Sequence, residues 1–206
     1  MANSNRRAIM TLYSDPSCPL CHRTRIALHE KNITANIEDL IDDHWPEDVA
    51  AANPYGNSPT LVDKNLVLFN ANIIIDYFDE RFVQPPLMPV DPAKRAQVRQ
   101  MLYRIDKDWY SLWNALMGLE KGKMAQARKS IQEDLTVLAP LFAQSAFFMN
   151  EDFSILDCAL APLLWRLPML NIKLPAKASA VEIYAKRIFN RASFQASLSD
   201  IERDMR

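Results

Sequence analysis

Residues 58–69 have the sequence SPTLVDKNLVLF, and this stretch organises the first half of the chain. A serine-proline pair precedes two β-prone runs, Thr60–Asp63 and Leu66–Phe69, which are joined by Lys64-Asn65. Two such runs with a two-residue connection predict a β-hairpin. The next residue, Asn70, is a predicted N-cap. The helix that it begins has a predicted apolar face made of Ile73, Ile74, Tyr77 and Phe78.

Strand-like and helix-like segments also alternate upstream of this hairpin. The apolar run at residues 8–13 predicts a strand, and residues 18–31 predict a helix. A second strand is predicted at residues 35–38 and a short helix at residues 46–52. The resulting order, β-α-β-α-β-β-α, predicts an α/β domain over residues 1–82.

Proline divides the chain after this domain. Residues 83–92 hold four prolines, which exclude a continuous helix and predict a proline-rich linker or loop. The remaining residues, 93–206, have helical apolar spacing and predict an all-helical domain. Ser154 and Asp157 form an acidic variant of the capping box. Helices are expected at residues 93–117, 123–143, 154–170 and 176–190, with a short one after Ser193.

Charge and glycine content exclude several classes of function. The 206 residues contain 24 Lys and Arg against 25 Asp and Glu, and a formal net charge of −1 gives no overall basic field for nucleic acid or acidic lipid. The three glycines, Gly56, Gly118 and Gly122, form neither a Walker loop nor a dinucleotide fingerprint. We therefore expect no direct DNA binding and no membrane association.

The N-terminus and the cysteines favour a cytoplasmic location. The first residues lack an apolar export signal, and no uncharged run reaches the roughly 18 residues of a transmembrane helix. The three cysteines, Cys18, Cys21 and Cys158, are an odd number and argue against a disulfide framework. The expected compartment is the reducing cytoplasm.

The two halves of the chain resemble one known family. The order of the first half, with Ser58-Pro59 leading into a strand, resembles a thioredoxin-fold domain. The helical second half, with its box from Ser154 to Asp157, is similar to the C-terminal domain of cytosolic glutathione S-transferases. This resemblance implies an α/β thioredoxin-like N-terminal domain plus an all-α C-terminal domain. It also implies a cis peptide bond before Pro59, which an X-Pro bond tolerates well.

Further blocks of sequence narrow this resemblance. They are Asn53-Pro54, residues 59–63 (PTLVD), Tyr77 with residues 79–82 (DERF), and residues 85–90 (PPLMPV), 107–110 (KDWY) and 161–168 (APLLWRLP). These blocks resemble a bacterial family of starvation proteins that associate with RNA polymerase and belong to the glutathione S-transferase superfamily. The resemblance implies a non-enzymatic transcription regulator of the stress response, a homodimer that binds RNA polymerase holoenzyme through its sigma subunit or core.

The same resemblance implies where the polymerase binds. In the family, the proline-rich loop after this DERF block is an exposed surface needed for the transcriptional role. Here that loop consists of Val83, Gln84, Pro85 and Pro86, where the usual family sequence is Pro-His-Pro-Pro. Because proline has a fixed φ, such a loop is expected to lose little conformational entropy on binding.

A pair of cysteines opens the first predicted helix and favours a different function. In Cys18-Pro19-Leu20-Cys21, a thiolate at the helix N-terminus faces the positive end of the dipole, which lowers its pKa. Cys18 would be the nucleophile and Cys21 the resolving thiol, with help from Arg23 and Arg25. This pattern predicts, as an alternative, a glutathione-dependent thiol transferase or disulfide reductase. Inert helix-start cysteines are the competing interpretation.

The residue after the pair creates a second motif. With His22 added, Cys18 to His22 match the attachment pattern of c-type haem, but that attachment would require export. A zinc site lacks an evident fourth ligand, because His44 and Cys158 are distant in sequence. We therefore expect no metal and no cofactor.

A dipeptide at the third predicted helix tests for glutathione binding. In glutathione transferases this helix begins with an acidic residue or Gln followed by Ser, which hold the γ-glutamyl group. Here the dipeptide is Asn70-Ala71, so the negative charge and the hydroxyl are both absent. Charged hydrogen bonds contribute roughly 1.5–3 kcal/mol each, so weak glutathione binding is expected. The result is a degenerate glutathione site made of Ser58, Pro59, Asn70 and Ala71.

Aromatic and basic clusters in the second half have structural interpretations. Trp109, Tyr110 and Trp113 have helical spacing and are expected in the core or at a dimer seam, rather than as a platform for nucleobases. The basic stretch is expected to be a solvated loop and helix start, and it contains Lys121, Lys123, Arg128 and Lys129.

Overall fold

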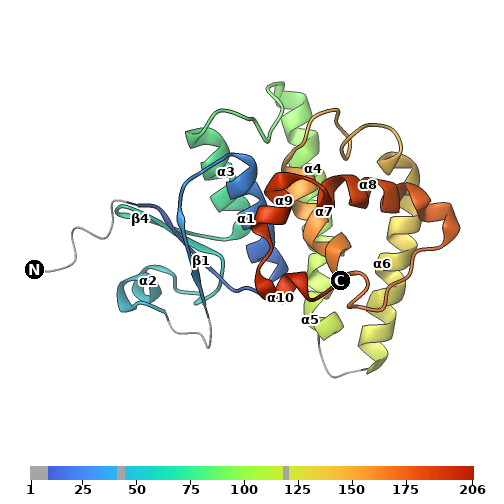
Figure 1. Cartoon of the computed structure of the whole chain (residues 1–206), viewed down its shortest axis with the longest axis horizontal. Helices are drawn as coiled ribbons and strands as arrows, with labels where there is room; N and C mark the ends of the chain where they lie inside the picture. The colour runs from blue at the N-terminus through green and yellow to red at the C-terminus, as the bar shows by residue number, and fades with distance from the viewer. Residues whose placement is uncertain (1–8, 41–44, 118–120) are drawn as a thin grey trace, which may run out of the picture. The chain divides into compact units, whose positions relative to one another are not determined.

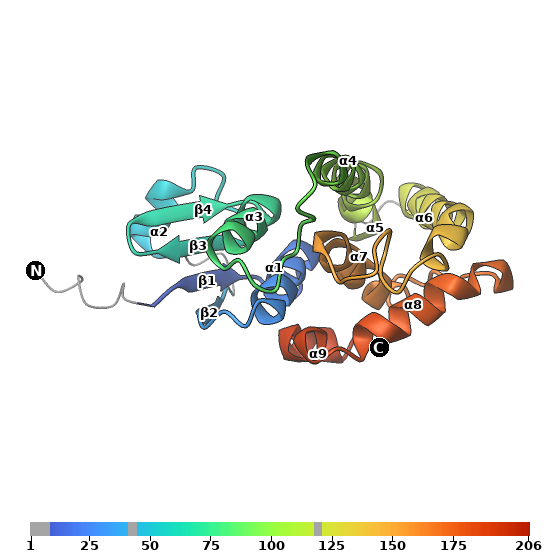
Figure 2. The same ribbon diagram turned by 90° about the horizontal axis from the view of Figure 1, so that it is seen from above.

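A computed structural model describes residues 9–40, 45–117 and 121–206 (Figures 1 and 2). It divides into two compact units, which are described separately. The first unit comprises Met1–Pro86 and Ala192–Asp204, and the second comprises Leu87–Arg191 with Met205–Arg206. The last short helices of the chain therefore belong to the unit that contains the N-terminal sheet.

The first unit contains a four-stranded mixed sheet with the order β2-β1-β3-β4. Its strands are β1 (Thr11–Ser14), β2 (Asn36–Asp39), β3 (Thr60–Asp63) and β4 (Leu66–Phe69). The strand β2 runs parallel to β1, whereas β3 pairs antiparallel with both β1 and β4. Figure 1 shows α1 (Pro19–Glu30) and α3 (Ala71–Arg81) on one side of this sheet and α2 (Glu47–Ala52) on the other.

Several local predictions for this unit are confirmed. The hairpin forms between β3 and β4, and the peptide bond from Ser58 to Pro59 is cis. Asn70 caps α3 because its side-chain oxygen accepts a hydrogen bond from the backbone N–H of Asn72 at 2.9 Å. The predicted apolar face of α3 is wrong at Ile73, which is 51% exposed. The face that packs inward consists of Ala71, Ile74, Ile75 and Phe78, at the spacing of one side of a helix.

The second unit is helical. Every residue of α7 except Trp165 is buried, and Figure 2 shows this helix between α4 and α8. Ser154 and Asp157 form the predicted capping box at its start, with Asp157 also accepting from Tyr184. The elements are α4 (Pro92–Asp108), η2 (Tyr110–Leu112), α5 (Trp113–Met117), α6 (Lys121–Phe142), α7 (Ile155–Arg166), η3 (Ala176–Ala178) and α8 (Ser179–Phe189).

The predicted continuous helix over residues 93–117 is wrong, because α4 ends at Asp108. Trp109 and Tyr110 turn into the core at this point. The indole N–H of Trp109 donates to Asp134 at 3.0 Å, and the hydroxyl of Tyr110 donates to the carbonyl of Ala159 at 2.9 Å. The helix ends where these inward contacts begin, and the burial of both side chains confirms the expected core position.

The end of the chain forms two short helices, α9 (Ala192–Ser197) and α10 (Asp200–Arg203), where one was predicted. A second capping box, from Ser199 to Glu202, begins α10. Both helices belong to the first unit, and α9 packs against α1. None of the helices in the described residues is both long and apolar enough to cross a membrane.

Candidate functional site

The two N-terminal cysteines lie at the start of α1. Cys18 is the N-cap residue and is partly exposed, whereas Cys21, one turn further on, is completely buried. The sulfur of Cys21 accepts a hydrogen bond from the backbone N–H of Asp15 at 3.3 Å, and the Ser58 side chain also contacts it. The fold thus brings Ser58, the residue before the cis-Pro59, to Cys21.

The two thiols have opposite electrostatic environments. A hydrogen bond from the Cys21 side chain lowers the pKa of Cys18 from an ordinary value of 9.0 to about 7, against the effect of burial. Burial raises the pKa of Cys21 well above its ordinary value. This arrangement favours a thiolate on Cys18 beside a protonated Cys21, which is the protonation state of a nucleophile and a resolving thiol.

The arginines expected to assist Cys18 are engaged elsewhere. Arg25 is buried and donates to the backbone carbonyl of Ser197 at 2.8 Å and to Glu202 at 2.5 Å. Arg23 is also buried and donates to the side-chain oxygen of Asn72 at 2.8 Å. Both cations therefore fasten α1 to other elements of the first unit.

The surroundings of His22 also indicate a structural role. It is completely buried, its Nε2 lies 3.0 Å from the Ser197 hydroxyl, and its Nδ1 lies 3.4 Å from Glu202. Cys158 lies in α7 of the second unit, and His44 falls outside the described residues. Across residues 9–40, 45–117 and 121–206, no group of three His, Cys, Asp or Glu side chains is placed to hold a metal ion.

The predicted degenerate glutathione dipeptide lies at the first turn of α3. The side-chain oxygen of Asn70 already accepts the N–H of Asn72, and Ala71 is only 4% exposed. The dipeptide thus contributes a helix cap and a small buried side chain. Neither residue presents the carboxylate or hydroxyl that would bind an amino-acid ammonium or carboxylate.

The proline-rich loop is exposed along its length. Val83 is 68% exposed, and Gln84, Pro85 and Pro86 are exposed as well. Underneath, Lys31 at the C-terminal end of α1 is buried and donates to the carbonyl of Pro85 at 2.6 Å. The bond from Gln84 to Pro85 is cis. The hydrogen bond from Lys31 holds the loop backbone at Pro85 while the side chains of the loop face solvent.

The helix before the loop, α3, is held by polar contacts to Lys31 and to Asp63 of β3. Lys31 also donates to Asp79 of α3 at 2.7 Å. The hydroxyl of Tyr77 donates to Asp63 of β3 at 2.5 Å, and Arg81 forms an ion pair with the same carboxylate. Sequence reasoning quoted these α3 residues as a family motif, but it gave no indication of Lys31, whose partners are far away in the chain.

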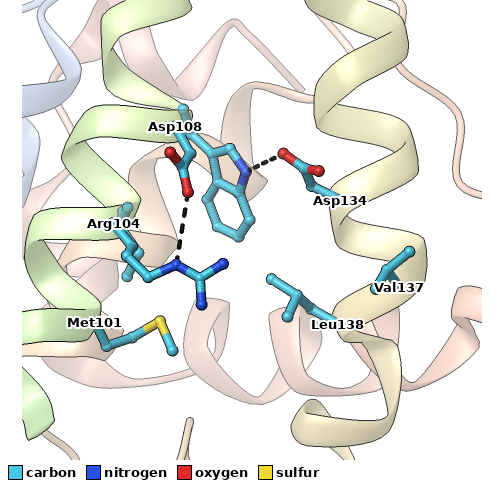
Figure 3. A pocket seen from close by; sticks show the side chains of 8 residues that line it. Met101, Arg104, Asp108, Asp134, Val137 and Leu138 are labelled. Carbon is cyan, nitrogen blue, oxygen red and sulfur yellow. Dashed lines mark hydrogen bonds and ion pairs between the residues drawn. The ribbon is translucent and has the colours of Figure 1, made fainter.

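A small cavity of about 130 Å³ lies between α4 and α6 in the second unit (Figure 3). The indole of Trp109 is held there by Asp134, and Arg104 pairs with Asp108 at 3.7 Å. The adjoining side chain of Val137 is 76% exposed. The cavity has room for one side chain, and its lining combines apolar side chains with the charged Arg104, Asp108 and Asp134.

Two family models match the two halves of the chain. The glutathione S-transferase N-terminal domain matches residues 12–86, and the glutathione S-transferase C-terminal domain matches residues 93–192. A stringent starvation protein A homologue of Coxiella burnetii is 43% identical over 205 residues, covering 98% of this chain and 97% of that protein. The chain belongs to the stringent starvation protein A family, within the glutathione S-transferase superfamily.

Other relatives agree with this assignment. The homologue of Pasteurella multocida is 45% identical over 199 residues, covering 95% of this chain and 92% of that protein. The crystal structure of glutathione transferase Omega 3C from Trametes versicolor superposes with a TM-score of 0.82, covering 96% of this chain and 88% of that one, at 25% identity. The expected fold, a thioredoxin-like domain followed by an all-α domain, is confirmed.

Proposed function

We propose that the protein is a non-enzymatic transcription regulator of the stress or starvation response that binds RNA polymerase holoenzyme. The contact surface is the loop formed by Val83, Gln84, Pro85 and Pro86. The observation that carries the proposal is the support of this loop, because the buried Lys31 holds its backbone while all four side chains remain exposed. Membership of the stringent starvation protein A family supports the choice of partner.

The chemistry of the loop suits a protein partner. Two prolines and an exposed valine form an apolar surface with few rotamers to immobilise. The hydrogen bond from Lys31 to Pro85 fixes the main chain before the partner arrives. The loss of the glutathione-anchoring side chains at Asn70 and Ala71 agrees with a role that does not involve glutathione turnover.

Co-elution with bacterial RNA polymerase holoenzyme on a sizing column tests the proposal. We expect the parent protein to co-elute and the Pro85→Ala, Pro86→Ala double variant to lose at least tenfold in affinity. Pro168→Ala, which alters an exposed proline of the second unit, is the matched control and is expected to bind normally. Absence of co-elution by the parent, or full binding by the double variant, would overturn the proposal.

Homodimerisation is part of the same proposal. Each unit has exposed apolar side chains that a second copy would cover: Tyr55 and Ile73 on the first, and Tyr103 and Val137 on the second. Val137 borders the cavity shown in Figure 3, which has room for one inserted side chain. Sedimentation equilibrium is expected to give a dimer mass for the parent and a monomer mass for Val137→Glu. A monomeric parent protein would contradict this part.

The lowered pKa of Cys18 favours a second candidate function, a glutathione-dependent thiol transferase or disulfide reductase. In this activity Cys18 attacks a disulfide as the thiolate, and Cys21 resolves the mixed disulfide. Turnover of a mixed disulfide with glutathione, lost in Cys18→Ser, would establish it. No turnover, together with polymerase binding that Cys18→Ser leaves intact, would leave the regulator as the function.

A further inference from the structure

A second cavity, of about 570 Å³, lies within the second unit between the end of α7, the turn that follows it and α8. Its volume falls in the range of small-molecule sites. The walls are mainly aliphatic, and most of these side chains are buried by the helix packing. The aliphatic lining residues are Leu164, Leu167, Ile172, Leu174, Val181 and Ala185.

The rim of this cavity is positively charged. Lys173 comes from the turn, Lys186 from α8, and Arg206 from the end of the chain, against one carboxylate, Glu182. The side chains of Lys173 and Lys186 form no ion pair with a described residue. Neither lysine is directly paired, and Glu182, four residues before Lys186 on α8, is the one acidic side chain of the lining.

Arg206 is held at the cavity by aromatic contacts. Its guanidinium lies 4.6 Å from the ring centre of Phe189 and 5.3 Å from that of Trp165. Such stacking orients the guanidinium plane, and the Glu182 carboxylate is close enough to attract this cation electrostatically. The aliphatic walls therefore border a cationic rim with one oriented member.

We propose that this cavity binds an amphipathic anion, an aliphatic carboxylate of medium chain length. The alkyl chain packs against Leu167, Ile172 and Val181, and the carboxylate pairs with Lys186 and Arg206. Charge and shape together select this class. A wholly polar anion would leave the aliphatic wall hydrated, and a neutral hydrocarbon would gain nothing from a rim where three cations face one carboxylate side chain. The bounded volume fits a small molecule better than a folded partner, which needs a broad surface.

Calorimetric titration of the 206-residue protein with decanoate tests this proposal. Decanol, which has the same alkyl chain without the charge, is the ligand control. We expect saturable binding of one decanoate per chain and at least tenfold weaker binding of decanol. Absence of saturable decanoate binding, or equal affinity for decanol, would overturn the proposal.

Three variants separate the cavity from the general surface. Lys173→Ala with Lys186→Ala removes the unpaired charges, and Ala185→Phe fills the cavity with a ring; each is expected to weaken decanoate binding at least tenfold. Lys177→Ala alters an exposed lysine that does not line the cavity, and it should bind like the parent.

Circular dichroism and the melting temperature would show that each variant is folded, and a folded Ala185→Phe with parental affinity would overturn the site. An acidic, apolar peptide that binds this surface when decanoate does not would assign it to protein docking instead. The polymerase co-elution experiment is independent of this result, because the loop at residues 83–86 lies in the other unit.

Discussion

Arg25 and Lys31 both belong to the region of α1, and each is a buried cation paired with an acidic side chain. Arg25 pairs with Glu202, whose carboxylate is completely buried and belongs to a helix near the end of the chain. Lys31 pairs with Asp79, which is 11% exposed, and also holds the carbonyl of Pro85. The first pair therefore closes the unit upon itself, whereas the second supports an exposed loop.

The difference separates the part of α1 that holds the first unit together from the part that supports an exposed loop. The turn that carries the cysteines is followed at once by His22 and Arg25, both of which bind the C-terminal helices. The other end of the helix leads into Lys31, which holds the carbonyl of Pro85 in the exposed loop at residues 83–86. The cysteine pair thus lies beside the side chains that hold the unit together, and the proposed binding surface lies at the opposite end of the helix.

Glu202→Ala is expected to lower the free energy of unfolding most, because it breaks the buried ion pair between Arg25 and Glu202. Removing this carboxylate leaves Arg25 as a buried charge without its ion-pair partner, and removal of one member of a buried pair costs about 3–5 kcal/mol. The free energy of unfolding, from urea denaturation, measures this loss. The matched control is Glu133→Ala, which breaks an exposed pair with Lys129 and should cost at most about 1 kcal/mol. Equal costs for the two variants would contradict the role given to Glu202.

Lys31→Met breaks the supporting pair and is expected to have a smaller effect on stability. The hydrogen bond to the carbonyl of Pro85 is lost at a cost of about 1.5–3 kcal/mol, whereas the loss of the bond to Asp79 is largely offset because this partly exposed carboxylate can be hydrated. Affinity for the polymerase should nevertheless fall at least tenfold, because the loop loses its backbone anchor.

Urea denaturation and co-elution with the holoenzyme measure the two effects of Lys31→Met separately. Lys64→Met, at an exposed position of the β3–β4 turn, is the control for a surface lysine. A folded Lys31→Met protein with parental polymerase affinity would show that binding by the loop does not depend on Lys31, and it would contradict the supporting role given to this residue.

Local sequence signals predicted the parts of this architecture that local physics determines. The hairpin at residues 58–69, the cap at Asn70 and the box at Ser154 each depend on neighbouring residues, and all three form. The box from Ser199 to Glu202 had a similar signal, a serine followed three residues later by a glutamate, and it was overlooked.

Pairings across long stretches of chain left no such signal. Nothing near Arg25 indicates that Glu202 is its partner, and nothing near Pro85 indicates Lys31. The end of α4 at Asp108 was missed for a related reason, because the inward turn of Trp109 depends on Asp134 of another helix. Partners of this kind are set by tertiary packing, which overrides helical periodicity.

Cys21→Ala is expected to have the smallest effect on stability. It tests the start of α1, where Cys21 lowers the pKa of Cys18. The hydrogen bond from Cys21 is the main reason that the pKa of Cys18 falls from 9.0 to about 7, and without it burial raises that pKa. The rate of alkylation by iodoacetamide should therefore have a midpoint near pH 7 in the parent and at or above the ordinary thiol value in the variant. Because the thiol ionises more easily in the folded protein, its ionisation stabilises the fold as the pH rises above 7, and Cys21→Ala removes this gain.

The control is Ser58→Ala, because Ser58 contacts Cys21 rather than Cys18. This variant should leave the midpoint of Cys18 alkylation close to that of the parent. A midpoint that stays near pH 7 in Cys21→Ala would contradict this role of Cys21. It would show that the N-terminus of α1 alone lowers the pKa of Cys18, so that Cys18 could react as a thiolate without the second cysteine.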